Sequence, residues 1–530
     1  LETSNAEVEQ LYWTGLLLFS VSTIRGLFAF THSYLGEAIG QNMAYQLRME
    51  YFDQLQKLSF KYHDNIHTGD LITLGILDIE GVRMFVNTGF IRLFFLLTLL
   101  GGGFLVMLKT DLFLGLISLS FVPIIAWRGT VTGLKLRRNW LIIQEKLSML
   151  TKVMDENLNG IRVVRAFCSQ SYEMDKYDRS SLEALRLFDK QISMRVSNDS
   201  LMSFVFLVSL GLVLWFGGQS VYSGEISLGT LTTFLAFMSI LQQPVRQIGM
   251  LVNSFSRAAS CGDRIFRVLD RKDYVDDNEK GKQVLDLGIL EFKNVYFSFP
   301  GENQPQILEG INLRLEPGCT LGITGPQGSG KSAFAQLIPR FYDPTSGEIR
   351  LNGVDLRNFK LKTLREKVSL VQQDTFLFTS TVKHNVLYGA PWASEEEVIG
   401  ASSKAQLHEH IDHLPHSYQT VIGERGLALS GGQRQRLNIS RSIILNSKIL
   451  IFDDSTSAID AATEKKIREG LMEGASDRIT IIISHRLASL MHANEIIYLE
   501  EGKISEQGSH QELVQQGGHY ARLYQLQTNY

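Results

Sequence analysis

The chain has 530 residues, too many for a single hydrophobic core, and therefore contains at least two domains. Its formal net charge of −3 gives no basic excess that would indicate a nucleic-acid partner. The mean hydropathy is +0.01, but long apolar runs are concentrated in the first half, whereas the second half has the mixed composition of a soluble domain. The three cysteines are scattered without metal-ligand spacing, so we expect reduced thiols.

Five apolar segments in the first half approach the roughly twenty residues that a helix needs to cross a bilayer. Buried helices of a large soluble protein are the alternative interpretation. Recurrence of such runs with short polar breaks between them favours membrane spans. The segments lie at about 11–38, 91–108, 112–127, 201–222 and 228–241.

Lysine and arginine indicate the orientation of these spans, because basic residues favour the cytosolic side. Arg128, Lys135 and Arg138 follow the third segment, whereas residues 1–10 contain no basic side chain. The long connections are therefore predicted to be cytosolic. Five spans place the start outside and the second half inside, so we expect a first span to precede this sequence in the natural chain.

Amphipathic stretches continue from the spans and predict helices that project well beyond the bilayer. Each of the two long cytosolic connections contains a short segment, at 63–71 and at 156–162, that is rich in glycine and Asn/Asp. These residues favour a break between two helical arms, and an ordinary loop is the alternative. In the first span, Arg25 must face a partner, a wet cavity or the bundle interior. Two interpretations of Arg25 remain: it pairs with a carboxylate or with backbone carbonyls, or it contacts a transported substrate.

A polar linker is expected from residue 271, and a strand begins near Leu290. A second strand at 320–324 leads into a glycine-rich loop, and a helix follows it. Strand, glycine-rich loop and helix form the context of a phosphate-binding loop. The loop residues are Gly325, Pro326, Gln327, Gly328, Ser329, Gly330, Lys331 and Ser332.

The residue types of this loop match the chemistry of a nucleotide. Backbone N–H groups of residues 327–331 would cradle the phosphates, and the helix N-terminus adds positive potential. Lys331 would reach the β- and γ-phosphates, and the Ser332 hydroxyl would bind Mg²⁺.

Two later strands end in polar residues that complete such a site. The buried-strand pattern at 448–452 ends at Asp453, whose carboxylate is placed to hold Mg²⁺. The strand at 479–483 leads to His485, which would put an imidazole near the γ-phosphate. A lone histidine after a strand is usually structural, but its place in this series favours a phosphate-sensing role.

Taken together, these motifs resemble a half-transporter of the ATP-binding cassette exporter family, and the resemblance runs through essentially all of the chain. The family implies a membrane all-α helical bundle, followed by an α/β P-loop nucleotide-binding domain with a helical subdomain. It also implies two halves whose cassettes bind two ATP molecules head to tail. The matching segments are GPQGSGKS, VQQD around Gln373, TVIGERG (420–426), LALSGGQRQR (427–436), KILIFDDSTSAID (448–460), IIISHR (481–486), FKYHDNIHTGDL (60–71), ENLNGIRVVRAF (156–167) and SGEISLGTL (223–231).

The resemblance implies roles for further residues. Gln373 would contact Mg²⁺ and sense the γ-phosphate, and Asp460 would couple the two sites. Phe299 stands where the family usually has an adenine-stacking tyrosine; its ring face is retained, and a simple core aromatic is the alternative. The two breaks in the helical arms resemble coupling helices, which would meet Glu424 and Arg425. The residues that would grip the ATP held by the partner are Ser430, Gly431, Gly432 and Gln433.

Asp454 departs from the family pattern, in which a glutamate at this place polarises the attacking water. Its carboxylate sits back by about 1.5 Å, one carbon–carbon bond, and a misplacement of about 1 Å can cost about a hundredfold in rate. We therefore expect ATP binding to survive and hydrolysis to slow, unless a shifted backbone lets aspartate suffice. Because the signature segment is intact, we expect a heterodimer in which this chain holds the slow site.

The predicted organisation is a transmembrane domain at 1–270, a linker at 271–288 and a nucleotide-binding domain at 289–530. We expect an ATP- and Mg²⁺-dependent exporter subunit whose partners are a second half-transporter, the bilayer and a small amphipathic substrate such as a drug, lipid or peptide, without nucleic acid. The expected location is a bacterial inner membrane, crossed several times, with a cytoplasmic cassette. A slow homodimeric exporter and an ATP-gated regulatory membrane subunit are the alternatives.

Overall fold

A computed structural model describes residues 5–246, 248–275, 281–283, 288–301, 304–423, 429–472 and 477–528. The chain forms two compact units. The first is built from the residues up to Gln56 and from Thr68 to Arg271, and the second from Lys57–His67 and the residues from Lys272 onward. Glu424 and Arg425, which we expected to meet the coupling helices, lie outside the described residues.

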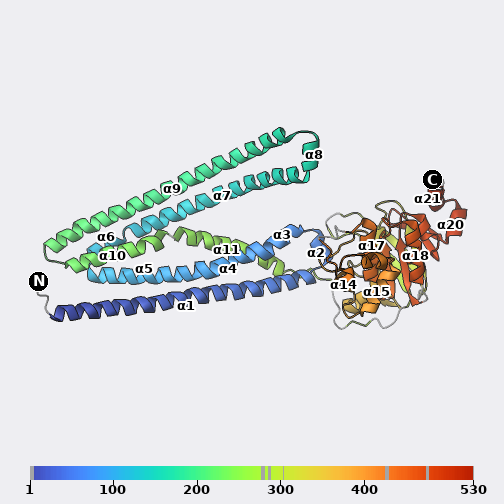
Figure 1. The fold of residues 1–530 in the computed structure, drawn as a ribbon, viewed down its shortest axis with the longest axis horizontal. Helices are drawn as coiled ribbons and strands as arrows, with labels where there is room; N and C mark the ends of the chain where they lie inside the picture. The colour runs from blue at the N-terminus through green and yellow to red at the C-terminus, as the bar shows by residue number, and fades with distance from the viewer. Residues whose placement is uncertain are drawn as a thin grey trace. The chain divides into compact units, whose positions relative to one another are not determined.

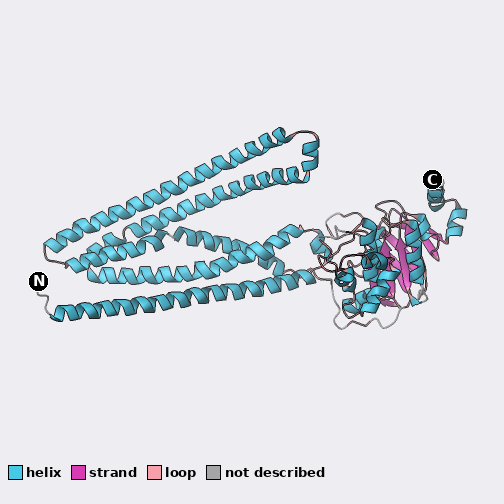
Figure 2. Ribbon diagram, in the orientation of Figure 1, coloured by secondary structure: helices cyan, strands magenta, loops and turns pink. Residues whose placement is uncertain are grey.

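The described part of the first unit is helical (Figures 1 and 2). Its longest helices have 53 residues, which corresponds to about 80 Å, more than twice the roughly 30 Å of a hydrocarbon core. The predicted continuation of the apolar segments into long helices is thus confirmed. The elements are α1 (Asn5–Lys57), α3 (Thr68–Thr73), the π-helical η1 (Leu74–Asp78), α4 (Ile79–Met84), the π-helical η2 (Phe85–Phe90), α5 (Ile91–Thr110), α6 (Leu112–Leu119), α7 (Phe121–Asn159), α8 (Ile161–Ala166), α9 (Gln170–Tyr222), α10 (Leu228–Arg246) and α11 (Ile248–Leu269).

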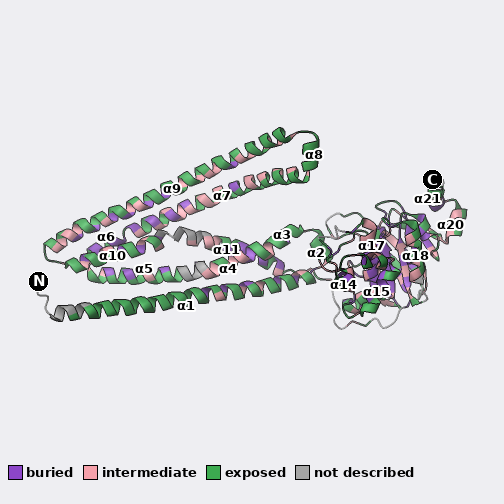
Figure 3. Ribbon diagram, in the orientation of Figure 1, coloured by how far each residue is buried: buried purple, intermediate pink, exposed green. Residues whose placement is uncertain are grey.

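Four helical stretches among the described residues are long and apolar enough to cross a membrane, and they contain four of the five predicted spans. The fifth predicted span forms α10 but is not one of them, because Gln242, Gln243 and Pro244 end its apolar run. Figure 3 shows that α1 is exposed along most of its length, and Arg25 is exposed there among apolar side chains. The four stretches are Tyr12–Lys57, Leu93–Thr110, Leu112–Asn159 and Gln170–Tyr222.

The third predicted span is interrupted where α6 gives way to α7 at Ser120. Pro123 follows in the first turn of α7 and has no N–H to donate to the carbonyl four residues earlier, so the helix cannot continue regularly. The Ser120 hydroxyl instead donates to the Ile117 carbonyl at 2.7 Å. Beyond this break α7 runs beside α9, and α8 joins them at the turn (Figure 1).

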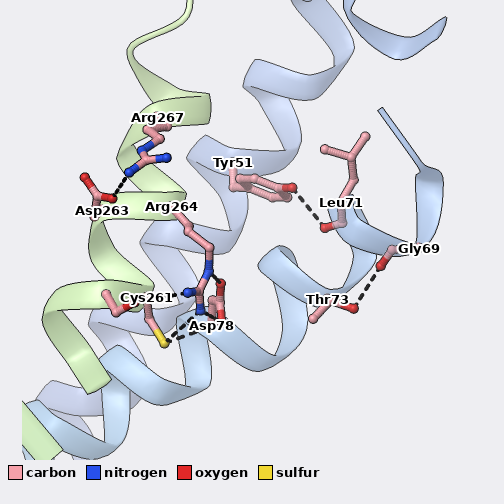
Figure 4. Close-up of polar contacts among 10 residues, drawn as sticks. Tyr51, Gly69, Leu71, Thr73, Asp78, Cys261, Asp263, Arg264 and Arg267 are labelled. Atoms are coloured by element: carbon pink, nitrogen blue, oxygen red, sulfur yellow. Dashed lines mark hydrogen bonds and ion pairs between the residues drawn. The ribbon is translucent and has the colours of Figure 1, made fainter. Parts of the chain in front are cut away.

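Polar contacts tie helices together at a cluster around the π-helical turn η1 (Figure 4). Asp78 is nearly buried and accepts hydrogen bonds from the Arg264 Nε and Nη2 atoms, both at 2.7 Å. The Cys261 thiol also donates to Asp78, at 3.4 Å, and burial together with this carboxylate raises the pKa of Cys261. The Tyr51 hydroxyl donates to the Leu71 carbonyl at 2.9 Å. All three cysteines of the chain are free.

The second unit contains two sheets, so the predicted α/β fold is confirmed (Figure 2). The strand order is β2-β1-β4-β5 in the antiparallel sheet and β10-β9-β3-β8-β7-β6 in the other. In the latter, β9, β3, β8, β7 and β6 are parallel. The strands are β1 (Leu290–Phe297), β2 (Leu308–Leu315), β3 (Thr320–Thr324), β4 (Ser346–Leu351), β5 (Val354–Asp355), β6 (Val368–Val371), β7 (Ile449–Asp453), β8 (Ile479–Ile483), β9 (Glu495–Glu500) and β10 (Lys503–Gly508).

Helices cover the parallel sheet, and a group of them forms the predicted helical subdomain. Helices α14–α17 share a core of their own, which includes Val386, Val398, Ile411 and Leu437. The helices are α12 (Lys331–Leu337), α13 (Leu361–Lys367), α14 (Val382–Leu387), α15 (Glu395–Lys404), α16 (His408–Asp412), α17 (Gly431–Ile443), α18 (Ala461–Met472), α19 (Leu487–Leu490), α20 (His510–Gln516) and α21 (His519–Thr528), with the 3₁₀ turns η3 (Leu356–Asn358) and η4 (Ser417–Gln419).

The first predicted break between helical arms, at 63–71, runs from the end of α2 (Phe60–Asp64) to the start of α3, and α2 packs within the second unit. The Phe60 ring stacks on Phe341 with 4.5 Å between centroids. The Tyr342 hydroxyl hydrogen-bonds the Asp64 carboxylate, and burial together with this carboxylate raises the pKa of Tyr342. This segment is therefore a docked helix rather than an ordinary loop. The second predicted break, at 156–162, contains the end of α7, Gly160 and the start of α8, all in the first unit.

Candidate functional site

Four sequence motifs meet at one edge of the parallel sheet. The strands β3, β8, β7 and β6 are neighbours in this order, and their register places Ile323 and Asp453 on either side of Ile483. The phosphate loop follows β3, Asp453 ends β7, His485 follows β8 and Gln373 follows β6. The carboxyl ends of parallel strands are where α/β folds bind ligands. The sheet thus gathers side chains that are far apart in the sequence.

Glycine is required in the phosphate loop for its backbone geometry. Gly325 has φ of +147° and Gly330 has φ of +99°, a region that other residues rarely adopt. A Cβ atom on Gly325 would lie 2.0 Å from the Leu499 carbonyl oxygen. Gly330 immediately precedes α12, so the loop turns its backbone into a helix N-terminus. This arrangement suits close approach of a phosphate to backbone N–H groups.

Lys331 is buried, and backbone groups surround its ammonium. Its Nζ atom donates to the Gly325 carbonyl at 2.9 Å and to the Pro326 carbonyl at 2.6 Å, and it lies 3.3 Å from the Ser329 hydroxyl. Burial lowers the pKa of Lys331, an effect that the charges of Asp453 and Asp454 partly offset. A phosphate in the loop would bring negative charge to this buried cation. The loop therefore fits a nucleotide.

Ser332 and Asp453 meet beside the loop. The Ser332 hydroxyl donates to Asp453 Oδ1 at 3.2 Å. Burial raises the pKa of Asp453, against the hydrogen bond from Ser332. A hydroxyl and a carboxylate are the hard oxygen ligands that Mg²⁺ prefers, so this pair fits the cation. Gln373 lies exposed just beyond β6, next to β7 in the sheet.

Asp454 lies directly after β7 with an unusual backbone conformation. Its φ is +43°, in the left-handed region that Asp tolerates better than most residues. Its N–H donates to the Ile483 carbonyl at 2.9 Å, which ties the end of β7 to β8. The His485 side chain is exposed just after β8. Asp453, Asp454 and His485 therefore lie at one corner of the parallel sheet, where the end of β7 is hydrogen-bonded to β8.

Three residues hold this corner without having been singled out in the sequence. Gln435 of α17 accepts from the Ala458 N–H at 2.9 Å, Arg486 donates to carbonyls of the segment after Asp454, and Gln527 contacts the backbone around His485. Arg486 and Gln435 lie inside matched motifs, and this position is the sequence signal that marks them. Gln527 follows all the motifs and carries no such signal.

The signature segment begins helix α17. The Ser430 hydroxyl accepts from the Gln433 N–H at 3.3 Å, while the Gln433 side-chain oxygen accepts from the Ser430 N–H at 2.8 Å, a capping box. A Cβ atom on Gly432 would lie 2.9 Å from the Ala458 carbonyl, so a side chain there would crowd the segment after Asp454. Gln433 is thus engaged in capping. Ser430 is exposed, together with the positive end of a 13-residue helix.

Phe299 lies just after β1 and is 36% exposed. Its ring makes T-shaped contacts with Phe297 at 5.1 Å and with Tyr342 at 5.3 Å between centroids. These contacts hold the ring in place while part of its surface stays open. Phe299 is therefore a partly exposed aromatic that can offer a ring face to a base.

Replacing Phe299 with alanine is expected to weaken ATP binding by about tenfold, because stacking of a base on an aromatic ring contributes about 1–3 kcal/mol. Phe299→Tyr keeps the ring and is expected to retain the affinity. Equilibrium binding of ATP, measured without turnover, checks this prediction. An unchanged affinity in Phe299→Ala with an unchanged melting temperature would assign Phe299 to the core alone.

Comparisons with known proteins agree with this geometry. Residues 1–245 match the family model of the ABC transporter transmembrane region, and residues 308–457 match the ABC transporter model. An uncharacterized ABC transporter ATP-binding protein of Bacillus subtilis, YknU, is 35% identical over 97% of this chain and 88% of its own length. An ATP-dependent lipid A-core flippase of Chromobacterium violaceum is 33% identical over 99% of this chain and 89% of its own length.

The fold is also that of a solved exporter. The structure of a bacterial Atm1-family ABC exporter with ATP bound superimposes with a TM-score of 0.85 and 25% sequence identity, covering 99% of this chain and 93% of the other. Helical spans, the phosphate loop at the sheet edge and relatives matched over nearly their whole length lead to one conclusion. The chain belongs to the ABC transporter family, and it is a multi-pass membrane exporter with a transmembrane domain and an ATP-binding domain.

Proposed function

We propose that this chain is one half of a heterodimeric exporter and holds its slower ATP site. The observation that carries the proposal is Asp454, with its shorter carboxylate, directly beside an intact Lys331, Ser332 and Asp453. The intact and capped signature segment, with Ser430 exposed, supports the second part, since it would serve the ATP held by the partner. We assign 1–270 to the transmembrane domain, 271–288 to the linker and 289–530 to the nucleotide-binding domain.

In the proposed cycle, each residue of the site has a separate task. Residues 327–331 and the start of α12 hold the phosphates, with Lys331 on the β- and γ-phosphates. Ser332, Asp453 and Gln373 hold Mg²⁺, which neutralises phosphate charge when bound. Asp454 orients the attacking water, and His485 contacts the γ-phosphate. Phe299 stacks on the adenine.

ATP binding is coupled to transport through α2 in this proposal. The Phe60–Phe341 stack and the Asp64–Tyr342 hydrogen bond fasten α2 within the second unit, so a movement of this unit carries α2 with it. Tyr342 also touches Phe299, the proposed adenine platform. Closure of two cassettes around ATP would then rotate the helical arms as rigid bodies and open the transmembrane helices toward the outside.

The proposed substrates are amphipathic or hydrophobic molecules. Their class follows from the apolar first unit and from the lipid flippase among the relatives, and it includes lipids, drugs and peptides. We place the protein in a bacterial inner membrane with the nucleotide-binding domain in the cytoplasm. Basic residues in the long connections support this orientation.

Reconstitution tests the proposal. Vesicles containing the lone chain, or the chain with a co-purifying half-transporter that has glutamate after its strand-end aspartate, are assayed for ATP turnover and for uptake of an amphipathic dye. We expect fast turnover and ATP-dependent uptake with the partner, and slow turnover without it. Fast turnover and uptake by the lone chain would indicate a homodimer. Dye flux that needs ATP binding but no hydrolysis would indicate an ATP-gated regulatory subunit.

A further inference from the structure

Helix α21 is anchored firmly against the parallel sheet. Tyr520 is fully buried in an apolar cluster with Leu487 and Leu490 of α19, and its hydroxyl lies 2.8 Å from His510 Nδ1. At the start of the helix, the Glu506 carboxylate accepts from the Tyr520 N–H at 3.1 Å and from the His519 N–H. The helix start is therefore fixed by packing and by hydrogen bonds.

Gln527 lies seven residues after Tyr520, two turns further along the same face of this helix. Its side-chain amide hydrogen-bonds the backbone on both sides of one residue of the neighbouring loop, Arg486. The Nε2 atom donates to the His485 carbonyl at 2.8 Å, and the Oε1 atom accepts from the Leu487 N–H at 3.0 Å. Because Leu487 is the first residue of α19, its N–H is a helix-start donor that lacks a partner within its own helix.

The side chain of Arg486 in turn hydrogen-bonds the segment that follows Asp454. Its guanidinium donates to the Ile459 carbonyl at 3.0 Å and to the Ser457 carbonyl at 2.6 Å. The backbone of the His485 loop is thus fixed on one side by Gln527. On the other side it is tied to the segment between Asp454 and α18.

We propose that Gln527 is a positioning residue for ATP hydrolysis at this chain's own site, an inference that rests on the proposed function. By fixing the backbone on both sides of Arg486, its amide sets the direction of the His485 imidazole and the reach of the Arg486 guanidinium. A displacement of about 1 Å at such a site can cost about a hundredfold in rate. Gln527 itself needs no contact with the nucleotide.

Glutamine suits this position because one amide offers one acceptor and two donors. The loop presents the matching pair, a carbonyl at His485 and an N–H at Leu487. Leucine has similar bulk and neither group. Glutamate keeps the acceptor for Leu487 but loses the donor, and it sets a carboxylate oxygen against the His485 carbonyl. Gln525 lies on the same helix, is exposed, and provides a matched control.

The test compares Gln527→Leu, Gln527→Glu and Gln525→Leu in the full-length chain, with turnover measured at this chain's own site, in an assembly whose other half carries Glu→Gln after its strand-end aspartate. We expect both Gln527 variants to lower kcat by about tenfold with KM for ATP unchanged, since the phosphate loop is untouched. In Gln527→Leu the amide of Leu487 is expected to exchange its hydrogen about tenfold faster, as the loss of about one hydrogen bond predicts, whereas Gln527→Glu keeps the acceptor for this amide. Gln525→Leu is expected to match the parent chain in both measurements.

A double-mutant cycle asks whether Gln527 acts through His485. If it does, Gln527→Leu lowers kcat in the parent chain but adds no further loss to His485→Ala. Additive losses, a kcat equal to that of Gln525→Leu, or unchanged exchange at Leu487 would each overturn the inference. The proposed function fails separately: fast turnover by the lone chain that still depends on Gln527 would reject the heterodimer and leave the positioning role standing.

Discussion

Replacing Lys331 with methionine is expected to lower ATP hydrolysis by about 10²–10³-fold, the range seen when one preorganised donor is removed from a developing charge. Methionine keeps most of the apolar stem and removes the ammonium, which lies within reach of the loop carbonyls of Gly325 and Pro326. The measurement is phosphate release at this chain's own site. It is made on the full-length chain in an assembly whose other half carries Glu→Gln after its strand-end aspartate, so that only this site hydrolyses ATP.

Stability should respond differently from activity in this variant. Burial lowers the pKa of Lys331, so loss of its charge removes a group that is unfavourable to bury. We expect the melting temperature without nucleotide to stay the same or rise, and the stabilisation by added ATP to disappear. Lys362→Ala, an exposed lysine on α13, serves as the control. Retention of more than about a tenth of the parent rate would contradict the role of Lys331.

Replacing Asp454 with glutamate is expected to raise turnover at this site by about 10- to 100-fold. The additional methylene advances the carboxylate by about 1.5 Å, and an error of about 1 Å is worth about a hundredfold in rate. Asp454→Asn is expected to abolish the remaining hydrolysis and to preserve ATP binding, because Lys331, Ser332 and Asp453 are intact. Single-turnover hydrolysis with ATP in each variant provides the comparison.

The backbone conformation at Asp454 predicts a second measurable effect of this substitution, on the melting temperature. With φ of +43°, the position favours the short polar side chain of aspartate, which tolerates the left-handed region better than glutamate does. The glutamate variant should therefore melt at a slightly lower temperature while it turns over faster. If turnover instead falls or stays the same, aspartate is already well placed by this backbone and the heterodimer hypothesis loses its main support.

The sequence alone determined the parts of this protein whose residue types are dictated by local chemistry. The phosphate loop needs glycines at Gly325 and Gly330, followed by a lysine and a hydroxyl residue in a fixed order. Its identity and its strand–loop–helix context can therefore be predicted from the order of these residues. The buried strands before Asp453 and His485 are apolar runs bounded by polar residues and were found for the same reason. Four of five spans followed from length and hydropathy.

Only the tertiary structure decided which distant segments touch. Glutamine occurs throughout the chain, and nothing local distinguishes Gln527, which contacts the His485 loop, from the exposed Gln525. The docking of Phe60 on Phe341 depends equally on partners brought together by folding. Hydropathy and motif spacing are properties of residues that are close together in the sequence. A hydrogen bond between two distant segments depends instead on the packing that aligns its donor and acceptor.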